Sequence, residues 1–295
     1  MHGKTKLTQP MKITSLILSL FLAATHLISA QDKPAYQLFD KNGKKTTYEK
    51  MLKGASKGEV VLFGEFHDNP ICHWLEFQLT RDLAENNKLV LGAEMFESDN
   101  QLPLDRYLKG EINQKGLDTL ARLWNNYKTD YKPLADFAKS KNIPFIATNI
   151  PRKFASLVYK KGFAALDTLS ATEKNWIAPL PFPYDPKLPG YVKMLEMSGG
   201  HGGENLPKAQ AVKDATMAHF ILKNLQASTI FVHYNGSFHS DYFDGINWYL
   251  LKDKPALKII TIASVSQKNL TKLEAENLQK ADYIIVVDED MTKTF

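Results

Sequence analysis

Two segments far apart in the chain share the frame Gly-x-Phe-His, and their polar side chains are suited to metal binding or acid–base chemistry. The segments are Gly64–His67 (GEFH) and Gly236–His239 (GSFH). Each follows a β-rich apolar run, EVVLF before the first and STIFVHYN before the second. Because ligands of open α/β sheets bind beyond the carboxyl ends of the strands, we expect both frames to supply one polar site.

Four side chains at predicted strand ends form the candidate catalytic site: Glu65, His67, Glu94 and His239. Glu65 and His67 are two residues apart, so they face the same way in an extended backbone. Glu65, His67 and His239 are also the predicted metal ligands, since histidines with carboxylates bind first-row divalent ions and leave a position open for water. Without a metal, a Glu–His pair can act as general acid and base.

Each of these residues also has a structural explanation. Glu65 or His67 alone could cap the helix that follows, and Glu94 could be a salt-bridge partner. His233 lies inside an apolar run and is best explained as a hydrogen-bonded core histidine. A frame with two fixed residue types also recurs by chance, so the repeat by itself is a modest signal.

The elements that must position these residues are strands alternating with helices. The strand-like runs are nearly continuous in apolar residues, as in a sheet buried on both faces. The predicted strands are 59–65, 88–96, 144–150, 228–236, 258–265 and 283–287, and the predicted helices include 70–83, 131–141, 207–225 and 270–280. This order predicts an α/β fold with a mostly parallel central sheet flanked by helices.

Two stretches without a convincing strand predict a smaller inserted helical domain. Residues 98–131 have helical patterns, and residues 152–205 contain PLPFPYDPKLPGY and SGGHGGEN, whose prolines and glycines disfavour regular ladders. The core domain would comprise residues 31–97, 132–151 and 206–295. A loop this long inside a compact domain is usually functional or disordered, and its aromatic residues argue against disorder.

The first thirty residues predict an export signal. Three lysines precede the apolar run LILSLFLAA, and small residues lead to Ala30. The run is too short to span a membrane as a stable helix, so no transmembrane segment is expected after cleavage. Cys72 is the only cysteine, which leaves no intrachain disulfide and no lipid-anchor cysteine near the cleavage site. We therefore expect a soluble periplasmic, cell-surface or secreted protein.

Charge and motifs exclude several classes of function. The net charge is +5, but the three lysines of the signal leave only +2 for the remaining chain. No Lys/Arg block or basic–aromatic pattern indicates nucleic-acid binding. The sequence has no P-loop, no G-x-G-x-x-G at Gly64 and no Gly-x-Ser-x-Gly elbow, which argues against a nucleotide-dependent enzyme or a serine hydrolase.

One predicted helix carries residues that could orient a strand-end histidine. In the segment 207–225, Gln210 and Asp214 are four residues apart and lie on one stripe. Buried there, they could fix the tautomer of such a histidine. A solvated face is the equally good alternative.

Taken together, the motifs resemble the ChaN family of bacterial haem-binding uptake proteins in the Tiki superfamily. They are GEFHDNPICHWLEFQ, ATNIPR, SGGHGG, AQAVKDATMAHFI and GSFH, in the family's order across about residues 35–290. The resemblance implies haem held between two subunits of a homodimer, through a tyrosine with a histidine nearby, and unidentified haem transport machinery. The superfamily also resembles metal-dependent peptidases, whose metal residues come from two Gly-x-x-His frames.

Haem binding needs an apolar slot, an axial ligand and positive groups for the propionates. Given the resemblance, Tyr191 is the first candidate ligand, with Tyr184 and His201 second, and Arg152 could meet a propionate. A structural alternative places Tyr191 on the apolar face of a short helix. Tyrosine ligands follow no spacing rule, so haem binding rests on the resemblance.

The predicted function is an exported haem-binding protein that takes part in haem or iron acquisition. The alternative is a metal-dependent hydrolase, peptidase-like or esterase-like, with Glu65 as general base at the GEFH/GSFH site. Whether the chain is an enzyme stays open on the sequence alone.

Overall fold

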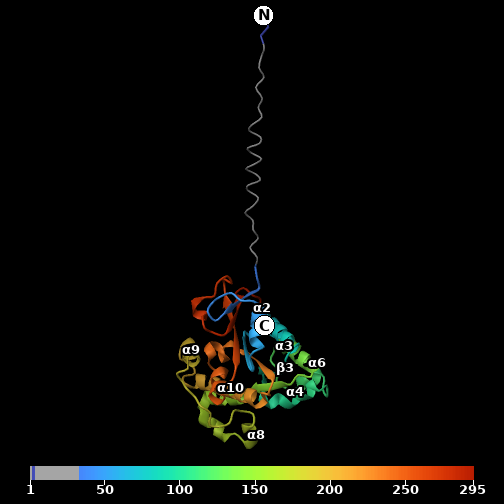
Figure 1. Cartoon of the computed structure of the whole chain (residues 1–295). Helices are drawn as coiled ribbons and strands as arrows, with labels where there is room; N and C mark the ends of the chain where they lie inside the picture. The colour runs from blue at the N-terminus through green and yellow to red at the C-terminus, as the bar shows by residue number, and fades with distance from the viewer. Residues whose placement is uncertain (1, 4–32) are drawn as a thin grey trace. The chain divides into compact units, whose positions relative to one another are not determined.

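The computed structural model describes residues 2–3 and 33–295, and residues 35–295 form one compact unit (Figure 1). The predicted export signal, residues 1–30, falls outside the described residues except for residues 2 and 3. Within the described part, every helix is too short or too polar to cross a membrane.

Strands and helices alternate along residues 35–295. The strands are β1 (Tyr36–Asp40), β2 (Val60–Glu65), β3 (Lys88–Glu97), β4 (Phe145–Asn149), β5 (Thr229–Gly236), β6 (Ile259–Gln267) and β7 (Tyr283–Asp288). The α-helices are α2 (Tyr48–Ala55), α3 (Pro70–Ala84), α4 (Gln101–Leu108), α5 (Gln114–Leu120), α6 (Lys132–Lys141), α7 (Arg152–Lys161), α8 (Ala171–Lys174), α9 (Pro189–Met197), α10 (Asn205–Asn224) and α11 (Ile246–Asp253). Short helical turns include η3 (Tyr127–Tyr131), η5 (Ser237–His239) and η7 (Ala275–Asn277).

The strands form one seven-stranded sheet in the order β1-β7-β6-β2-β5-β3-β4. All neighbours pair in parallel except β1, which runs antiparallel to β7. The predicted mostly parallel sheet is confirmed, whereas the five-residue edge strand β1 was not predicted. β5 lies between β2 and β3, and Glu65 stands opposite Gly236. The two Gly-x-Phe-His frames therefore end at the same edge because their strands are in-register neighbours.

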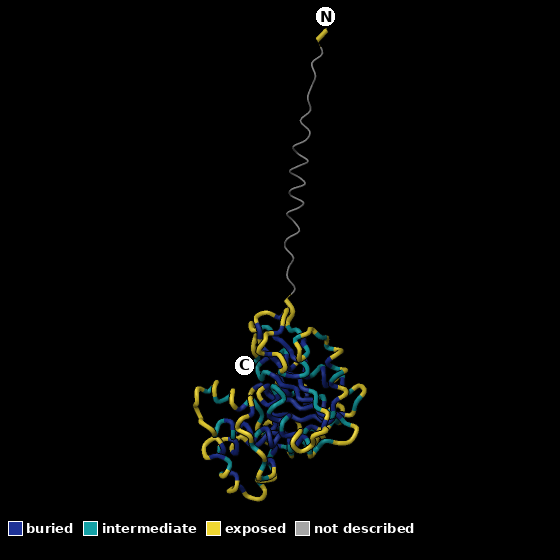
Figure 2. Tube along the Cα trace, turned by 60° about the vertical axis from the view of Figure 1, so that its left-hand side comes forward, coloured by how far each residue is buried: buried dark blue, intermediate teal, exposed yellow. Residues whose placement is uncertain are grey.

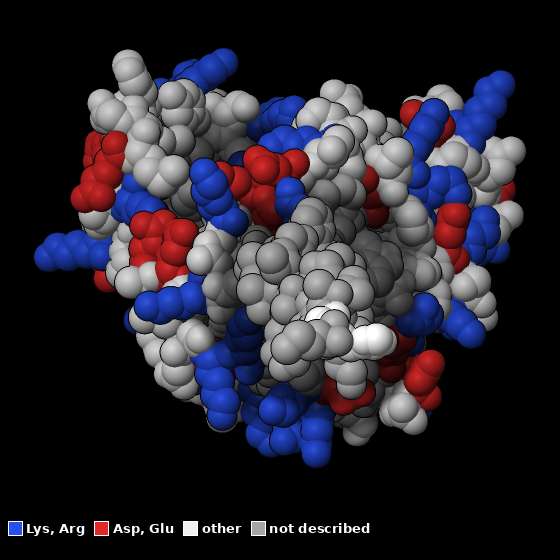
Figure 3. All heavy atoms as spheres, turned by 90° about the horizontal axis from the view of Figure 1, so that it is seen from above, with Lys and Arg blue, Asp and Glu red and all other residues white. Residues whose placement is uncertain are grey.

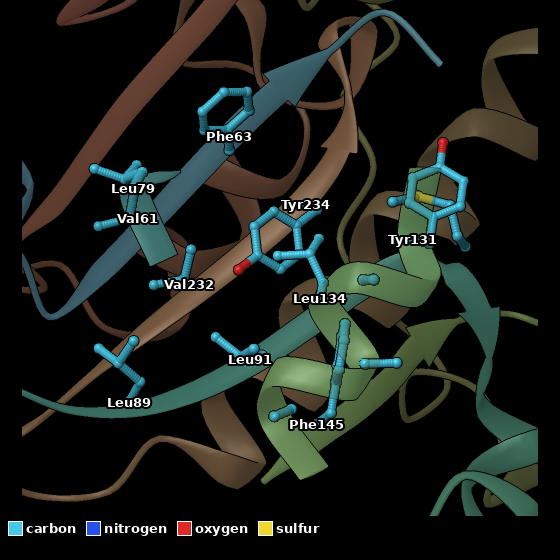
Figure 4. Packing of buried hydrophobic residues seen from close by; sticks show 14 of the residues in the cluster. Val61, Phe63, Leu79, Leu89, Leu91, Tyr131, Leu134, Phe145, Val232 and Tyr234 are labelled. Atoms are coloured by element: carbon cyan, nitrogen blue, oxygen red, sulfur yellow. The ribbon is translucent and has the colours of Figure 1, made fainter. Parts of the chain in front are cut away.

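Helices cover both faces of the sheet. Val61 and Phe63 of β2 belong to the hydrophobic cluster that includes α3 and α6, while Val60 and Leu62 belong to the cluster with α10 and α11. Figure 1 shows α3, α4 and α6 together on one side and α10 on the other. The strands are buried between these layers (Figure 2), and Figure 4 shows the α3–α6 side of the core. Burial on both faces explains the continuous apolar runs of the sequence.

The two stretches predicted as an insertion contain helices and no strand in the structure. Residues 98–131 hold α4, α5 and η3, and residues 152–205 hold α7, α8 and α9. α7 packs against α10 through a cluster that includes Phe154, Val158 and Val212. The division into a core domain and an inserted helical domain stays a prediction.

The helix predicted at 270–280 is wrong, because only the short turn η7 forms there. The Gln267 side chain donates to the carbonyl oxygens of Asn269 and Lys272 and accepts from the Glu274 backbone and the Asn277 amide. These side-chain bonds offer the backbone an alternative to helical pairing.

Candidate functional site

The end of β2 presents Glu65 and His67 to the site and leaves helix capping to another residue. Asn69 is the N-cap of α3, and its Oδ1 accepts hydrogen bonds from the backbone nitrogens of Ile71 at 3.0 Å and Cys72 at 3.2 Å. His67 Nδ1 lies 2.5 Å from Glu65 Oε1. The capping explanation therefore does not apply to Glu65 or His67.

The end of β5 is built around a glycine that makes room for His67. The Gly236 backbone nitrogen donates to Glu94 Oε2 at 2.8 Å. A Cβ at this position would lie 2.7 Å from His67 Nε2, closer than real Cβ contacts. The turn η5 then directs His239 back toward Glu94, with the two side chains nearly fully buried.

The two histidines meet at one carboxylate. His239 Nε2 lies 3.2 Å from Glu94 Oε1, and His67 Nε2 lies 3.9 Å from Glu94 Oε2. Glu94 follows the last regular β3–β5 pair at Ala93. The structure thus brings Glu65, His67, Glu94 and His239 together, as the strand-end argument predicts.

Helix α10 supplies the partners that hold His239. Asp214 Oδ1 lies 2.5 Å from His239 Nδ1, and Gln210 Nε2 lies 2.9 Å from the same nitrogen. The Tyr191 hydroxyl donates to Asp214 Oδ2 at 2.9 Å. The stripe of Gln210 and Asp214 is therefore buried against the histidine, and the solvated-face alternative is wrong.

A second group of ionisable residues lies on the other side of Glu65 and is closed to solvent. His73 Nδ1 lies 3.1 Å from Glu65 Oε2 and 3.3 Å from Glu76 Oε2, and the Tyr131 hydroxyl donates to Glu65 Oε1 at 2.7 Å. Neither Glu76 nor Tyr131 was predicted from the sequence as a residue of the site. The available signal was the His73-x-x-Glu76 spacing, which places both side chains on one face of a helix.

Burial and ion pairing set the charges of the site. Burial alone would raise the pKa of Glu65, but hydrogen bonds from His67 and His73 hold it well below its usual range. Burial would lower the pKa of His239, but Glu94 and Asp214 raise it to about 9. The pKa of His67 is also raised, chiefly by its bond to Glu65 against the effect of burial. At neutral pH His239 is therefore charged and lies beside the Glu94 carboxylate.

Two cavities adjoin the histidines. The smaller, about 470 Å³, is lined by the polar groups Glu65, His67, Glu94, Gln210, Lys213 and His239 and by the apolar groups Phe66, Met194, Phe238 and Phe295. The larger, about 720 Å³, is lined on its cationic side by Arg122, Arg152 and Lys153. His67 and Phe295 line both. Each volume is within the range of small-molecule sites.

The four predicted haem-binding residues lie in different surroundings. Arg152 is exposed at the start of α7 and lines the larger cavity with His67. Tyr191 is buried, and burial together with Asp214 raises its pKa far above the ordinary value. Tyr184 packs beside it with ring centroids 5.8 Å apart, and His201 is exposed in the turn between α9 and α10. Their roles as ligands stay predictions.

The remaining strand-end residues are structural. His233 is fully buried between Thr148 and Asn235, and burial lowers its pKa to about 4. It is a neutral core histidine, as predicted. Asn149 donates to the Glu94 carbonyl oxygen at 3.0 Å and so supports the strand end that carries Glu94.

A match to a protein-family model shows the family of this chain. The model described as haem-binding uptake, Tiki superfamily, ChaN matches residues 51–250, which is more than half of the chain. The chain belongs to the ChaN family. The match includes both Gly-x-Phe-His frames, and membership supports a haem-related function. No curated protein sequence matches the chain.

Solved structures agree on the fold of this ChaN-family chain. One is described as cofacial haem binding to ChaN of Campylobacter jejuni; it is 18% identical, with a TM-score of 0.63, and the match covers 87% of this chain and 98% of that one. A succinoglycan biosynthesis protein is 12% identical, with a TM-score of 0.51 and coverage of 84% and 94%. At these identities the likeness concerns the fold alone.

Proposed function

We propose that this protein is an exported haem-binding protein that serves haem or iron acquisition, and that haem occupies the cavity between the two Gly-x-Phe-His frames. Membership of the ChaN family supports the ligand class. The observation that carries the location is His67, whose Nδ1 is held by Glu65 and which lines both cavities.

His67 is the axial ligand that the geometry favours. A carboxylate on Nδ1 fixes the tautomer and the ring orientation and makes Nε2 a better donor to iron. The His67 side chain is 33% exposed, against 5% for His239, so it is the more accessible of the two histidines. Iron and a proton compete for the imidazole of His67, whose pKa is raised by Glu65, so haem affinity should fall as pH falls.

The cavity walls suit a flat apolar ligand with anionic ends. Phe238 is half exposed, and it lines the smaller cavity with Phe66 and Met194, so these side chains can cover a porphyrin face. Arg152, in the larger cavity, forms no ion pair with any described residue, whereas Lys153 is already paired with Glu173 at 3.1 Å. Arg152 is therefore available to a propionate that extends into the larger cavity.

Tyr191 remains an untested candidate for the axial ligand. To bind iron it would have to leave Asp214 and lose its proton, and burial opposes the phenolate. Tyr184 and His201 lie outside the walls of both cavities. We therefore rank His67 before these three residues.

The setting of the proposed function follows from the sequence and from a relative. Residues 1–30 predict export to the periplasm or the cell surface. The Campylobacter jejuni structure is described as binding haem cofacially. We propose that a second copy of this chain covers the haem-loaded cavity, so that the loaded species is a homodimer.

Titration with ferric haem tests the proposal. We expect a saturable shift of the Soret band and a mass that matches the haem-loaded dimer. Tyr191→Phe, Tyr184→Phe and His201→Gln should each leave the shifted spectrum in place. No saturable shift would refute haem binding, and loss of the shift in Tyr191→Phe would reassign the axial ligand.

The hydrolase alternative has one observation in its favour, the convergence of Glu65, His67, Glu94 and His239 at an open cavity. In this reading Glu65 is the general base and Glu65, His67 and His239 hold a metal that activates water. Contacts with the histidines hold the pKa values of Glu65 and Glu94 below the usual range, so both carboxylates are weak bases at neutral pH. Assays of peptide and ester hydrolysis with added Mn²⁺, Co²⁺ or Zn²⁺ test it, and no restored activity excludes it.

A further inference from the structure

We propose that Glu65, His73 and Glu76 form a closed structural centre for one first-row divalent cation, on the buried side of Glu65. The inference does not depend on the proposed function. The three residues supply one imidazole nitrogen and two carboxylates, and one ligand atom from each lies within 4.8 Å of the others.

The centre is assembled by two elements of the core. His73 and Glu76 are one turn apart on α3, and residues three apart on a helix lie on one face, so both side chains can meet one ion. Glu65 ends β2, on which α3 packs. All three side chains are at least nine-tenths buried. Each ligand is therefore held by regular secondary structure rather than by a loop.

Two carboxylate oxygen atoms of this centre are buried without a hydrogen-bond partner. Glu76 Oε1 is buried and accepts no hydrogen bond from any described residue, although Glu76 is fully buried. Glu65 Oε2 likewise accepts no well-aligned hydrogen bond, and it lies 3.1 Å from His73 Nδ1. Buried carboxylates are normally paired, hydrogen-bonded or bound to a metal. A cation between the three residues would provide a partner for both oxygen atoms.

The surrounding residues have the arrangement of an outer ligand shell. His73 Nε2 lies 3.1 Å from the His67 carbonyl oxygen and 3.5 Å from Asp130 Oδ2, which leaves Nδ1 as the ligand atom. The Tyr131 hydroxyl donates to the Glu65 oxygen that faces away from His73. Such contacts orient metal ligands and fix the histidine tautomer. One nitrogen and two carboxylates suit Zn²⁺, Mn²⁺ or Fe²⁺.

The test is elemental analysis of the haem-free full chain, both as purified and after refolding with Zn²⁺ or Mn²⁺ followed by transfer to metal-free buffer. The variant Glu76→Gln keeps the side-chain shape and removes the charged ligand. His239→Gln alters the open cavity only, and Glu85→Gln is a matched control at the exposed end of α3. We expect one equivalent of metal in the wild type, His239→Gln and Glu85→Gln, and loss of that equivalent in Glu76→Gln.

Three results would overturn the inference: no metal in the wild type after refolding with either ion, retention of metal by Glu76→Gln, or loss of metal in His239→Gln. The last would place the ion in the open cavity. If Glu76→Gln does not fold, the wild type decides the question. Its unfolding temperature should be higher after refolding with the ion than with a chelator, and equal temperatures would refute the centre.

Discussion

The two sides of Glu65 contain the same residue types in different surroundings. On one side, His73 and Glu76 are enclosed by α3 and the sheet; on the other, His67 and Glu94 face a cavity. The His73 side chain is 5% exposed and that of His67 is 33% exposed. Access to water and ligand, rather than residue type, therefore separates a structural role from a binding role.

The difference arises from where each histidine lies relative to its element. His73 is within the first turn of α3, so it packs into the core with that helix. His67 lies in the short turn between β2 and α3, and Gly236 has no Cβ to collide with its ring. Glu65 joins the two sides by contacting both rings. Substitutions on the closed side, on the open side or at Glu65 itself therefore test whether the two sides differ in role.

Replacement of Glu65 should have the largest effect because it breaks both sides. Glu65→Ala leaves His67, His73 and Tyr131 without their shared acceptor. Removing one partner of buried ion pairs costs roughly 3–5 kcal/mol of unfolding free energy. Urea denaturation measures this loss, and Glu85→Ala should change the free energy by less than about 0.5 kcal/mol. If Glu65→Ala lowers the free energy of unfolding no more than His67→Gln does, the contacts of Glu65 with His73 and Tyr131 do not contribute to stability.

The pH dependence of the unfolding free energy should show how much the ion pairs of His239 on the open side stabilise the fold. The folded pKa of His239, about 9, lies above the unfolded value of about 6.5, so the stabilisation is complete below pH 6.5 and is lost as pH rises through 9. Each unit of pKa difference is worth about 1.4 kcal/mol. Chemical denaturation from pH 6 to 10 should show this decline in the wild type and a flatter profile in His239→Gln. Equal slopes would contradict the pairing with Glu94 and Asp214.

Filling the space at Gly236 should affect the cavity more than the fold. In Gly236→Ala the new methyl group meets His67 Nε2, and overpacking costs about 1–3 kcal/mol. We expect a weakened haem-induced Soret shift as well, because the ring must move. Gly190→Ala is the control, since its Cβ would lie 3.5 Å from Asp244 Oδ2, an ordinary contact. Unchanged haem binding in Gly236→Ala would separate His67 from the ligand.

The smallest effect is expected from the exposed arginine. Arg152→Ala should weaken haem binding roughly two- to fivefold, the range for solvent-exposed charge pairs. The effect should shrink at high salt because exposed charges are screened. Lys153→Ala is the matched comparison, since Lys153 already pairs with Glu173. Haem titrations at two ionic strengths measure both, and a larger effect for Lys153→Ala would reverse the assignment.

Much of the open site could be predicted from the sequence because it depends on strand ends. Continuous apolar runs identify parallel strands, and parallel neighbours bring Glu65, His67 and His239 to one edge. Helical spacing also places Gln210 and Asp214 on one stripe, which the structure shows to face His239. Both inferences use only the period of the backbone and the rule for strand ends.

The closed side could not be predicted in the same way. Whether His73 and Glu76 face Glu65 depends on how α3 is rotated against β2, which spacing alone does not determine. Tyr131 reaches Glu65 from η3, an irregular turn with no sequence period. The helix predicted at 270–280 failed because side-chain hydrogen bonds of Gln267 replace helical ones.

Parallel haem titrations of His67→Gln and Glu76→Gln test the central claim most directly. Each variant replaces one ionisable side chain with a neutral amide, on the open side of Glu65 in His67→Gln and on the closed side in Glu76→Gln. We predict that His67→Gln lowers haem affinity roughly tenfold or more and alters the Soret band, whereas Glu76→Gln keeps the wild-type spectrum. Wild-type affinity and spectrum in His67→Gln would contradict the proposed haem site.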